Sequence, residues 1–509
     1  MKKIFVIKAI IICFISLSHY AVQAQKITWG EVYTLKDGVI SGSTLSLKND
    51  AWKCKVTAGT GRGFNMKFLL KSLFFNKELK FVTEEDMKST SLKEEMKKTS
   101  KSRTGDISKD LYSIFVANFK DAAQKKTLYE DGMNIFDISY PFPASLKTNI
   151  TKDSNLILAD IQEEKNNNKI KYTTFNKNYE VKEGNIQLPS NYEQIEIIDA
   201  LIHNETQIQI ILKYGKKDDK VLLLSYNIQK QKLETTELPL AKALAYKGIT
   251  NNQNLYILSV EPSEKKHHSS KLKISIYNTD GKFIKEQLNT FSNDFTNTAK
   301  SDDGMVNFKD WEFSNDVTIN DYGQMVVNGE YHRMSEVQSS SGSFQPTNDS
   351  RTGRITMQYK DNTRNISTGM YIHEYSSTYL FLIDINSLNM KNFVIRKNQS
   401  NMISTYLSTQ SFSNGKDFYI FHNDHKKNVN LAPNKSPQRY DLNNSALRVH
   451  KLTPDGIFEE KVLVTEQEDK KMKEAVINLK SIFYHKKDKS FYAPAFKDSS
   501  MGIMRIDIQ

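Results

Sequence analysis

The sequence predicts an all-β protein, and three observations carry this prediction. Short apolar runs alternate with polar turns along most of the 509 residues, at the spacing of β-strands. Aromatic residues are plentiful, with 24 Tyr and 27 Phe, and only 10 Pro interrupt the chain. The patterns of long amphipathic helices are nearly absent. We therefore expect sheets rather than a helical bundle.

The stretch Lys271–Phe291 shows the repeating unit most clearly. Two apolar runs flank Asn278-Thr279-Asp280-Gly281, and Asp-Gly between such runs is a strong hairpin signal because Gly readily adopts the positive φ of the turn. Thr453-Pro454-Asp455-Gly456 repeats the signal, with Pro fixing φ at the start of the turn. We therefore expect two tight hairpins that turn at Gly281 and Gly456.

Versions of this unit recur with a period near 50 residues. The runs that end at Phe175, Tyr226 and Tyr277 are 51 residues apart. The corresponding run that ends at Ile383 follows after 106 residues, as expected for one repeat that carries a long insertion. Four strands in each repeat of about 50 residues are typical of blade architectures.

Apolar alternation and the turn residues between runs justify the individual strands. Before residue 150 we expect strands at Ile27–Leu35, Val39–Leu47, Trp52–Val56, Phe64–Leu70, Leu111–Phe119 and Met133–Tyr140, with a strand–turn–strand unit at Phe74–Leu79. After residue 150 we expect sets of strands within 155–188, 195–238, 243–291, 308–395, 403–464 and 477–508. The third runs of the sets are almost wholly apolar, which favours strands covered on both faces.

This pattern resembles a β-propeller, and the resemblance covers most of residues 26–509. It rests on period and strand pattern, because the chain lacks Trp-Asp dipeptides at the repeat ends and glycine pairs of the kelch type. It implies one domain over residues 25–509 with about seven four-stranded blades, or six. The last set has three strands, so we expect the N-terminal strand to complete it and close the ring. An array of β-sandwiches is the structural alternative.

Three segments are expected to be insertions: 84–104, 335–377 and 423–446. The first is highly charged, and the capping-box spacing of Ser91-Leu92-Lys93-Glu94 favours a short exposed helix. Within the second we expect a flexible loop and then a protruding hairpin. The second and third, like the shorter loop 261–270, join the second and third strands of their sets. These loops should therefore lie side by side on one face.

Residues 1–24 have the features of a secretory signal peptide. Lys2 and Lys3 precede an apolar core, and Val22-Gln23-Ala24 offers small residues for cleavage after Ala24. We therefore expect a secreted or periplasmic protein whose mature chain has no transmembrane segment. Cleavage removes three Lys and lowers the net charge from +12 to +9. The basic residues form no stripe, which disfavours nucleic acid as a partner. Cys54 is expected to pack inward in a strand.

Histidines and carboxylates gather in or beside the insertions. The candidate ligand-binding residues are His267, His268, Glu330, His332, Arg351, Arg354, His373, Glu374, His422, Asp424 and His425. Imidazole with carboxylate can bind a divalent metal ion or transfer protons, but no metal-site spacing is present. We therefore assign no catalytic residue and no cofactor, and leave a divalent metal open. The arginines could bind carboxylates or sulfates.

The sequence contains no nucleophile elbow, phosphate-binding glycine loop or dinucleotide fingerprint. We therefore predict a binding or interaction module of the cell envelope, with a protein or a glycan as its partner. The alternative is an extracellular hydrolase or lyase that acts on a polysaccharide. Its carboxylates would come from different strands and would leave no motif in the sequence.

Overall fold

The computed structural model describes most of the chain after the predicted signal peptide. The described residues are 26–36, 39–48, 51–60, 67–91, 116–117, 119–120, 123–124, 147–150, 156–162, 168–190, 192–215, 220–251, 253–299, 304–348, 355–401, 407–429, 431–432, 435–440, 444–463, 472 and 475–507. The signal peptide and its cleavage site lie outside these residues. Within them, no helix is both long and apolar enough to cross a membrane.

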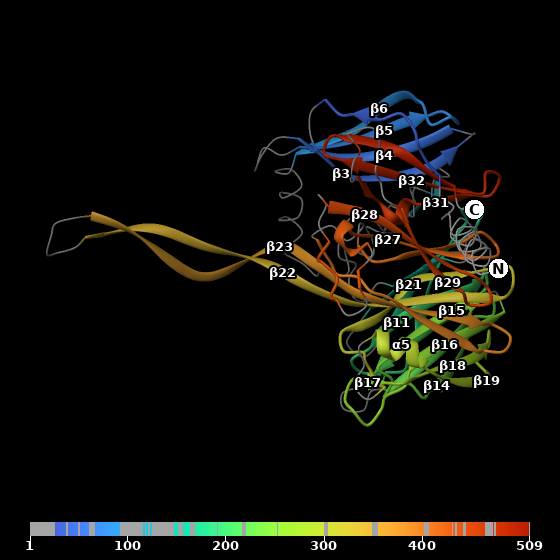
Figure 1. The fold of residues 1–509 in the computed structure, drawn as a ribbon. Coiled ribbons are helices and arrows are strands. Elements are labelled where there is room, and N and C mark those ends of the chain that lie inside the picture. The colour runs from blue at the N-terminus through green and yellow to red at the C-terminus, as the bar shows by residue number, and fades with distance from the viewer. Residues whose placement is uncertain are drawn as a thin grey trace, which may run out of the picture. The chain divides into compact units, whose positions relative to one another are not determined.

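The chain divides into two compact units, which are described separately. One combines Met1–Leu92 with Leu463–Gln509, and the other is Lys93–Val462. Antiparallel sheets make up nearly all of the described part of each unit (Figure 1). The single domain over residues 25–509 and the closure of the ring stay predictions.

The first unit contains two sheets, with the strand orders β3-β4-β5-β6 and β1-β33-β32-β30. The N-terminal strand pairs with the C-terminal strand in the register Ile27↔Ile506, so it completes the last sheet as predicted. The ring of Trp52 in β4 packs on that of Tyr492 in β32, with centroids 4.3 Å apart. The elements are β1 (Lys26–Trp29), β2 (Tyr33–Thr34), β3 (Val39–Lys48), β4 (Ala51–Thr60), β5 (Lys67–Phe75), β6 (Phe81–Ser91), β30 (Val476–Ile477), η7 (Leu479–Ser481), β31 (Phe483–His485), β32 (Ser490–Lys497) and β33 (Ser500–Asp507).

The second unit contains five further sheets with a path of four strands and one two-stranded sheet, β17-β20. The first two four-stranded sheets are β7 (Lys147–Ile150), β8 (Leu156–Gln162), β9 (Lys169–Phe175) and β10 (Val181–Gln187), and then β11 (Glu196–Asn204), β12 (Gln207–Tyr214), β13 (Lys220–Asn227) and β14 (Lys232–Leu238). The third is β15 (Ala245–Asn251), β16 (Asn254–Val260), β18 (Lys271–Asn278) and β19 (Phe283–Thr290), near which lie β17 (His268–Ser269), α5 (Asn293–Thr298) and β20 (Val306–Asn307).

The last two sheets of this unit lie around the long insertions. One is β21 (Trp311–Ile319), β22 (Gln324–Asn348), β23 (Ile355–Asp384) and β24 (Met390–Ile395), with β25 (Gln399–Asn401) paired to β23. The other is β26 (Gln410–Ser413), β27 (Phe418–His425), β28 (Ser445–Leu452) and β29 (Phe458–Leu463), with η4 (Lys426–Asn428) after β27.

The sheets of the second unit pack as blades. Their first strands contact one another in chain order, from β7 through β11, β15 and β21 to β26. Third strands such as β13 are buried along most of their length, whereas the fourth strand β19 is almost wholly exposed. With seven sheets that each have a path of four strands in the described chain, the predicted class, an all-β β-propeller of about seven blades, is confirmed.

Several details of the sequence prediction also hold. The turn before β19 closes with the Gly281 amide donating to Asn278 O at 3.0 Å, and Gly281 has φ of 79°. The turn before β29 has Gly456 at φ of 83°. Cys54 is fully buried in β4, and burial raises the pKa of its thiol.

Two segments near the N-terminal third differ from the prediction. Residues 84–91, expected in a charged insertion, belong to strand β6 because they pair with β5. Residues 116–117 and 119–120 are helical, so the strand predicted at Leu111–Phe119 is wrong there. The capping-box helix after Ser91 and the strand at Met133–Tyr140 lie outside the described residues.

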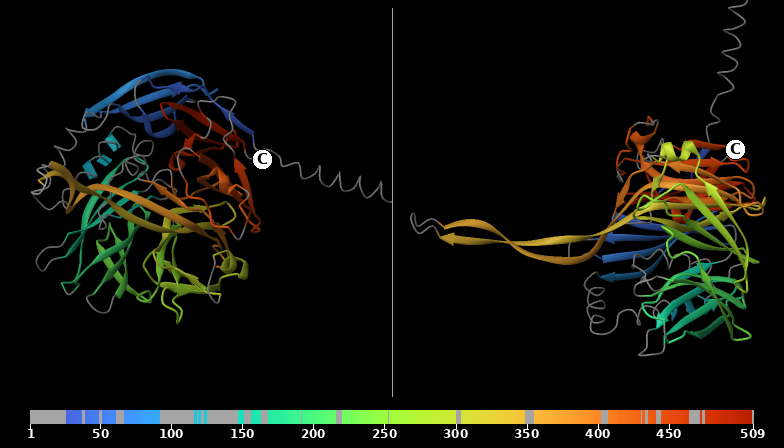
Figure 2. Two further views of the ribbon diagram at one scale, coloured as in Figure 1. Left: turned by 60° about the vertical axis from the view of Figure 1, so that its left-hand side comes forward. Right: turned by 90° about the horizontal axis from the view of Figure 1, so that it is seen from below.

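A long two-stranded arm replaces the flexible loop predicted after residue 335. Strands β22 and β23 leave their sheet and continue as one antiparallel pair to Asn348 and Ile355. We call residues 336–348 and 355–371 the arm, and residues 329–335 and 372–379, from which it continues, the arm root. Figures 1 and 2 show it extending far beyond the sheet that it comes from. The prediction was wrong because the ladder already formed in the blade continues through polar residues that carry no strand signal of their own.

We expect Gly329→Ala to destabilise the root of the arm. A Cβ on Gly329 in β22 would overlap the buried Trp311 ring and lie 2.8 Å from Glu312 O, and such overpacking typically costs about 1–3 kcal/mol. Gly502→Ala is the matched control, because its Cβ would lie 3.7 Å from Trp29 Cε3 at ordinary contact distance. Thermal unfolding should show a lower midpoint for Gly329→Ala only. Equal midpoints for the two variants would contradict this packing.

Candidate functional site

The loops that join second and third strands lie side by side in the second unit. Strand β17 in the loop 261–270 pairs with β20, and the chain after β20 meets the arm root, where the His332 amide donates to Asp310 O at 3.1 Å. On the other side of the arm root, β23 pairs with β25. The loop after β27 follows, with the Tyr440 amide donating to Asn398 O at 2.8 Å. One continuous surface therefore surrounds the arm root.

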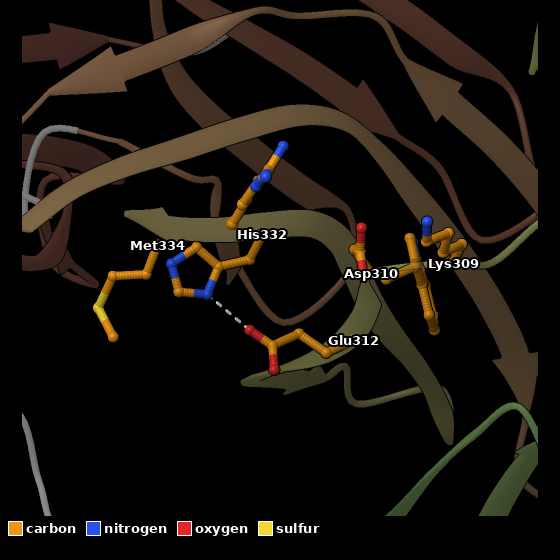
Figure 3. Close-up of a pocket in the computed structure, with 7 residues that line it drawn as sticks. Lys309, Asp310, Glu312, His332 and Met334 are labelled. Atoms are coloured by element: carbon orange, nitrogen blue, oxygen red, sulfur yellow. Dashed lines mark hydrogen bonds and ion pairs between the residues drawn. The ribbon is translucent and has the colours of Figure 1, made fainter. Parts of the chain in front are cut away.

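This surface contains two adjoining open depressions of about 510 and 390 Å³. We call them together the hollow. Lys309, Asp310, His332 and Arg333 line both parts. The first part is completed by Trp311, Glu312 and Met334, and the second by Tyr331, Glu374, Tyr375, Ser376, Asn398, Gln399 and Arg439. Figure 3 shows the first part, with His332 turned toward Glu312.

A hydrogen-bonded row joins Glu312 and His332, which line the hollow, to His373. Glu312 Oε1 lies 2.7 Å from His332 Nδ1, and His332 Nε2 lies 3.2 Å from His373 Nδ1. A carboxylate only accepts hydrogen bonds, so Nδ1 of His332 donates to Glu312. The ring of His332 also stacks on Tyr375, with centroids 4.5 Å apart and planes 9° apart. These contacts fix the orientation of the His332 ring.

A buried ion pair lies beneath this row. Lys397 Nζ is 2.7 Å from Glu330 Oε2, and both residues are at most 3% exposed. Glu330 Oε1 accepts from Thr409 Oγ1 at 2.6 Å and from Ser408 Oγ at 2.8 Å. These two residues precede β26 of the next sheet. Glu330 therefore fastens the arm root to the neighbouring blade.

The same ion pair supports the aromatic wall of the hollow. Lys397 Nζ lies 5.6 Å from the centroid of the Tyr375 ring, within the range of a cation–π contact. Burial opposes the ionisation of Glu330, but the charge of Lys397 and the hydroxyl donors prevail and lower the pKa of this carboxyl. Burial, with the Glu330 charge nearby, raises the pKa of Tyr375. Tyr375 therefore stays a neutral phenol.

A second pair of opposite charges lies on the rim. Arg439 Nη2 is 3.5 Å from Glu374 Oε1, and both side chains are more than 40% exposed. Glu374 is also the cross-strand partner of Arg333. An exposed pair of this kind contributes little to stability, so these side chains can exchange one partner for another at low cost.

The group His422, Asp424 and His425 lies inside its blade and does not line the hollow. His422 and Asp424 are fully buried. Asp424 accepts from Arg448 Nη1 at 2.6 Å and from Asn428 Nδ2 at 2.7 Å. His425 Nδ1 accepts from the Lys427 amide at 3.1 Å and so caps η4. These contacts are those of a polar core that holds the loop after β27.

The remaining candidates are also placed away from the hollow or lie outside the described residues. His267 adopts φ of 60° in the loop before β17. His268 Nδ1 donates to Lys266 O at 2.7 Å. Arg351 and Arg354 lie outside the described residues. Of the candidates, the structure therefore brings together His332, His373 and Glu374 at the hollow, with Glu330 beneath it.

Sequence reasoning missed several residues that line or support the hollow. They are Lys309, Asp310, Glu312, Arg333, Tyr375, Lys397 and Arg439. Arg333 and Tyr375 could have been found by continuing the predicted pairing of the second and third strands past Glu330 and Thr378. Lys397 and Arg439 carry no such signal, because their positions follow from loop paths. Within the described residues, no group of three or more His, Cys, Asp or Glu could hold a metal ion.

Comparisons with known proteins give only remote likenesses. No family model and no curated protein sequence matches the chain. Among solved structures, the chain is similar to the α-L-arabinofuranosidase Arb93A of Fusarium graminearum, with 9% identity, 72% of this chain and 94% of that chain covered, and a TM-score of 0.30.

Two other solved structures are similar over more of the chain. One is the β-propeller domain of the Trilobed protease of Pyrococcus furiosus. The match has 9% identity, covers 86% of this chain and 96% of that chain, and gives a TM-score of 0.23. A lignostilbene dioxygenase of Pseudomonas brassicacearum has 8% identity, 96% and 94% coverage, and a TM-score of 0.31. Likenesses at this level carry no argument about fold or activity.

We expect Lys397→Met to be strongly destabilising, because it leaves Glu330 charged and buried without its partner. Breaking a buried pair in this way typically costs about 3–5 kcal/mol. Lys232→Met is the control, because its ion pair with Glu234 lies at the surface and its loss should leave the unfolding midpoint unchanged. The double variant Glu330→Leu/Lys397→Met should recover much of the lost stability. If denaturant unfolding gave the same free energy of unfolding for Lys397→Met and Lys232→Met, the stabilising role of the Glu330–Lys397 pair would be contradicted.

Acid should weaken the blade that contains His422 and His450. Both rings are fully buried, and in the described structure none of their four nitrogens has a hydrogen-bond partner. Burial lowers the pKa of His422 to about 4 and that of His450 well below its usual value. In the unfolded chain each imidazole binds a proton near pH 6.5. The free energy of unfolding is therefore highest above that pH and declines toward pH 4, by about 1.4 kcal/mol per pH unit for each ring.

The variant His450→Phe tests this dependence. His450 stacks on Phe458 with centroids 5.1 Å apart, so a phenyl ring suits the same place. We expect a melting temperature close to that of the wild type at pH 8 and above it at pH 5. If the melting temperature of the wild type did not decrease when the pH is lowered from 7 to 5, the claim that buried His422 and His450 weaken the blade in acid would be wrong.

Proposed function

We propose that the protein is a glycan-binding module of the cell envelope and that the hollow is its binding site. The observation that carries this proposal is the mixture of groups on the rim. The lining contains both the donors of Lys309, Arg333 and Arg439 and the carboxylate acceptors of Glu312 and Glu374. Sugar hydroxyls both donate and accept hydrogen bonds, so a polyhydroxylated ligand can use both kinds of group.

Other classes of ligand fit this rim less well. An anion would meet the carboxylates of Asp310, Glu312 and Glu374. An apolar ligand would find few apolar partners, because charged and polar side chains make up most of the lining. The hollow is open rather than enclosed, which suits a chain that continues beyond the bound residues. The expected signal peptide would place the protein where such chains occur.

A second candidate is an enzyme that cleaves a polysaccharide at the same place. The carboxylates of Asp310, Glu312 and Glu374 come from different strands and loops, as those of glycosidases do. The carboxylate of Glu312, held by His332, offers a proton acceptor in the hollow. Chromatography of glycans incubated with the protein separates the two candidates, because a binding module releases no shorter products.

The variant Arg333→Ala tests the site itself. Arg333 is exposed on β22 and lines both parts of the hollow, and loss of a charged hydrogen bond to a ligand costs about 1.5–3 kcal/mol. We therefore expect glycan affinity to fall at least about tenfold, with stability unchanged. Lys282→Ala, at the turn before β19, is the matched control and should bind like the wild type. The measurement is a glycan array followed by calorimetry on the best ligand.

Two results would refute the proposal. One is the absence of binding to every glycan on the array. The other is an affinity for Arg333→Ala equal to that of the Lys282→Ala control. If the protein bound an envelope protein and no glycan, it would be an interaction module, and the proposal of a glycan site in the hollow would be wrong.

A further inference from the structure

One buried side chain holds the loop that carries Arg439 into the hollow. Asn428 is 1% exposed and is the last residue of η4. Its Nδ2 donates to Gln438 O at 2.8 Å, and its Oδ1 accepts from the Gln438 amide at 2.6 Å. Asn428 therefore binds the backbone of the residue next to Arg439 through one donor and one acceptor, as a neighbouring strand would.

Asp424 fixes the Asn428 amide from the other side. Asn428 Nδ2 also donates to Asp424 Oδ1 at 2.7 Å, and Asp424 Oδ2 accepts from Arg448 Nη1 at 2.6 Å. Burial opposes the ionisation of Asp424, but donors such as Asn428 and Arg448 prevail and lower the pKa of its carboxyl. Because a charged acceptor lies on one side and Gln438 O on the other, the side chain between them must donate to both.

The residues on either side of Arg439 are also attached to Asn398, which lies between β24 and β25. The Tyr440 amide donates to Asn398 O at 2.8 Å, and Asn398 Nδ2 donates to Pro437 O at 3.4 Å. The backbone of residues 437–440 therefore has contacts with Asn428 and with Asn398, and these contacts set the position from which Arg439 extends.

The Arg439 side chain reaches the strands beside the hollow from this position. Its Nη2 lies 3.5 Å from Glu374 Oε1 in β23 and donates to Ser400 Oγ in β25. The side chains of Arg439 and Glu374 are 59% and 45% exposed, so their attraction is weak. A ligand in the second part of the hollow can therefore replace Glu374 as the partner of Arg439 without a movement of the loop.

We propose that Asn428 is a positioning residue of the hollow, which holds Arg439 where its guanidinium can donate to a bound glycan. This role rests on the proposed function of the hollow. A binding side chain must be held within about 0.5 Å of its productive position, and Asn428 contributes to this through the backbone of Gln438. The buried group around Asp424 thereby affects a binding site that it does not line.

The isosteric variant Asn428→Asp tests this role. The new carboxylate can accept from the Gln438 amide but cannot donate to Gln438 O, and it lies against the charged Asp424. We expect the glycan affinity measured by calorimetry to fall about tenfold, as in Arg439→Ala, which removes the guanidinium. Asn428→Ser, which brings no charge, takes its place if Asn428→Asp does not fold, and the same loss is expected.

Asn176→Asp is the matched control. Asn176 is 5% exposed in the turn between β9 and β10, and its Nδ2 donates to Glu180 Oε2 at 2.7 Å and to Glu205 Oε1 at 3.0 Å. The substitution again sets a carboxylate against acidic partners, but Asn176 does not line the hollow. Thermal unfolding should show a lower midpoint for both aspartate variants, whereas only Asn428→Asp should lose glycan affinity.

The double variant Asn428→Asp/Arg439→Ala separates positioning from a general loss of stability. If Asn428 acts through Arg439, its substitution costs no further affinity once the guanidinium is absent. Three results would overturn this role: an affinity of Asn428→Asp equal to that of Asn176→Asp, an affinity of Arg439→Ala equal to that of the wild type, or losses that add in the double variant.

Failure of this role is distinguishable from failure of the proposed function. If the wild type binds no glycan, or if Arg333→Ala binds as well as Lys282→Ala, the proposed function is wrong, and the role of Asn428 is wrong with it. If Arg333→Ala weakens glycan binding and Asn428→Asp does not, only the role of Asn428 is wrong.

Discussion

The buried ion pair of Glu330 and Lys397 is the interaction on which the arm root and the hollow depend. Removing two charges from water is costly, and the cost is offset only where both are fully hydrogen-bonded. Glu330 meets this condition with Lys397, Ser408 and Thr409. The same carboxylate joins β22 to the next blade, and the same ammonium lies against Tyr375. A single buried contact therefore fixes where the arm begins and how the aromatic wall of the hollow is oriented.

Continuity of two strands links this scaffold to the site. β22 and β23 are blade strands as far as Glu330 and Thr378, and beyond that point their register shifts. Such irregularities occur where a strand pair changes its surroundings. The residues just past this point, with His332 and Arg333 on one strand and Glu374 and Tyr375 on the other, line the hollow. The site thus uses the rigidity of the blade, while the arm continues outward from it.

Much of the fold could be predicted from the sequence, because buried strands need apolar runs and turns need Gly281 and Gly456. The place of the N-terminal strand in the last sheet was predicted from topology, because the C-terminal set of strands has only three members in sequence. The arm was missed, because polar residues such as Ser339–Ser343 pair only as a continuation of the blade. Histidine in loops indicated His332 and His373, which lie at the hollow, but also His422, which is buried in the core. Burial depends on packing between distant strands, and spacing alone does not reveal it.

The central claim is that a glycan binds in the hollow at the arm root. Hydrogen–deuterium exchange of the purified protein, with and without its best oligosaccharide ligand, tests this claim most directly. The account predicts slower exchange on binding in peptides covering Lys309–Glu312, Tyr331–Met334 and Glu374–Ser376, and no change in the turn at Asn278–Gly281. Slower exchange confined to segments outside the hollow, with these peptides unchanged, would contradict it.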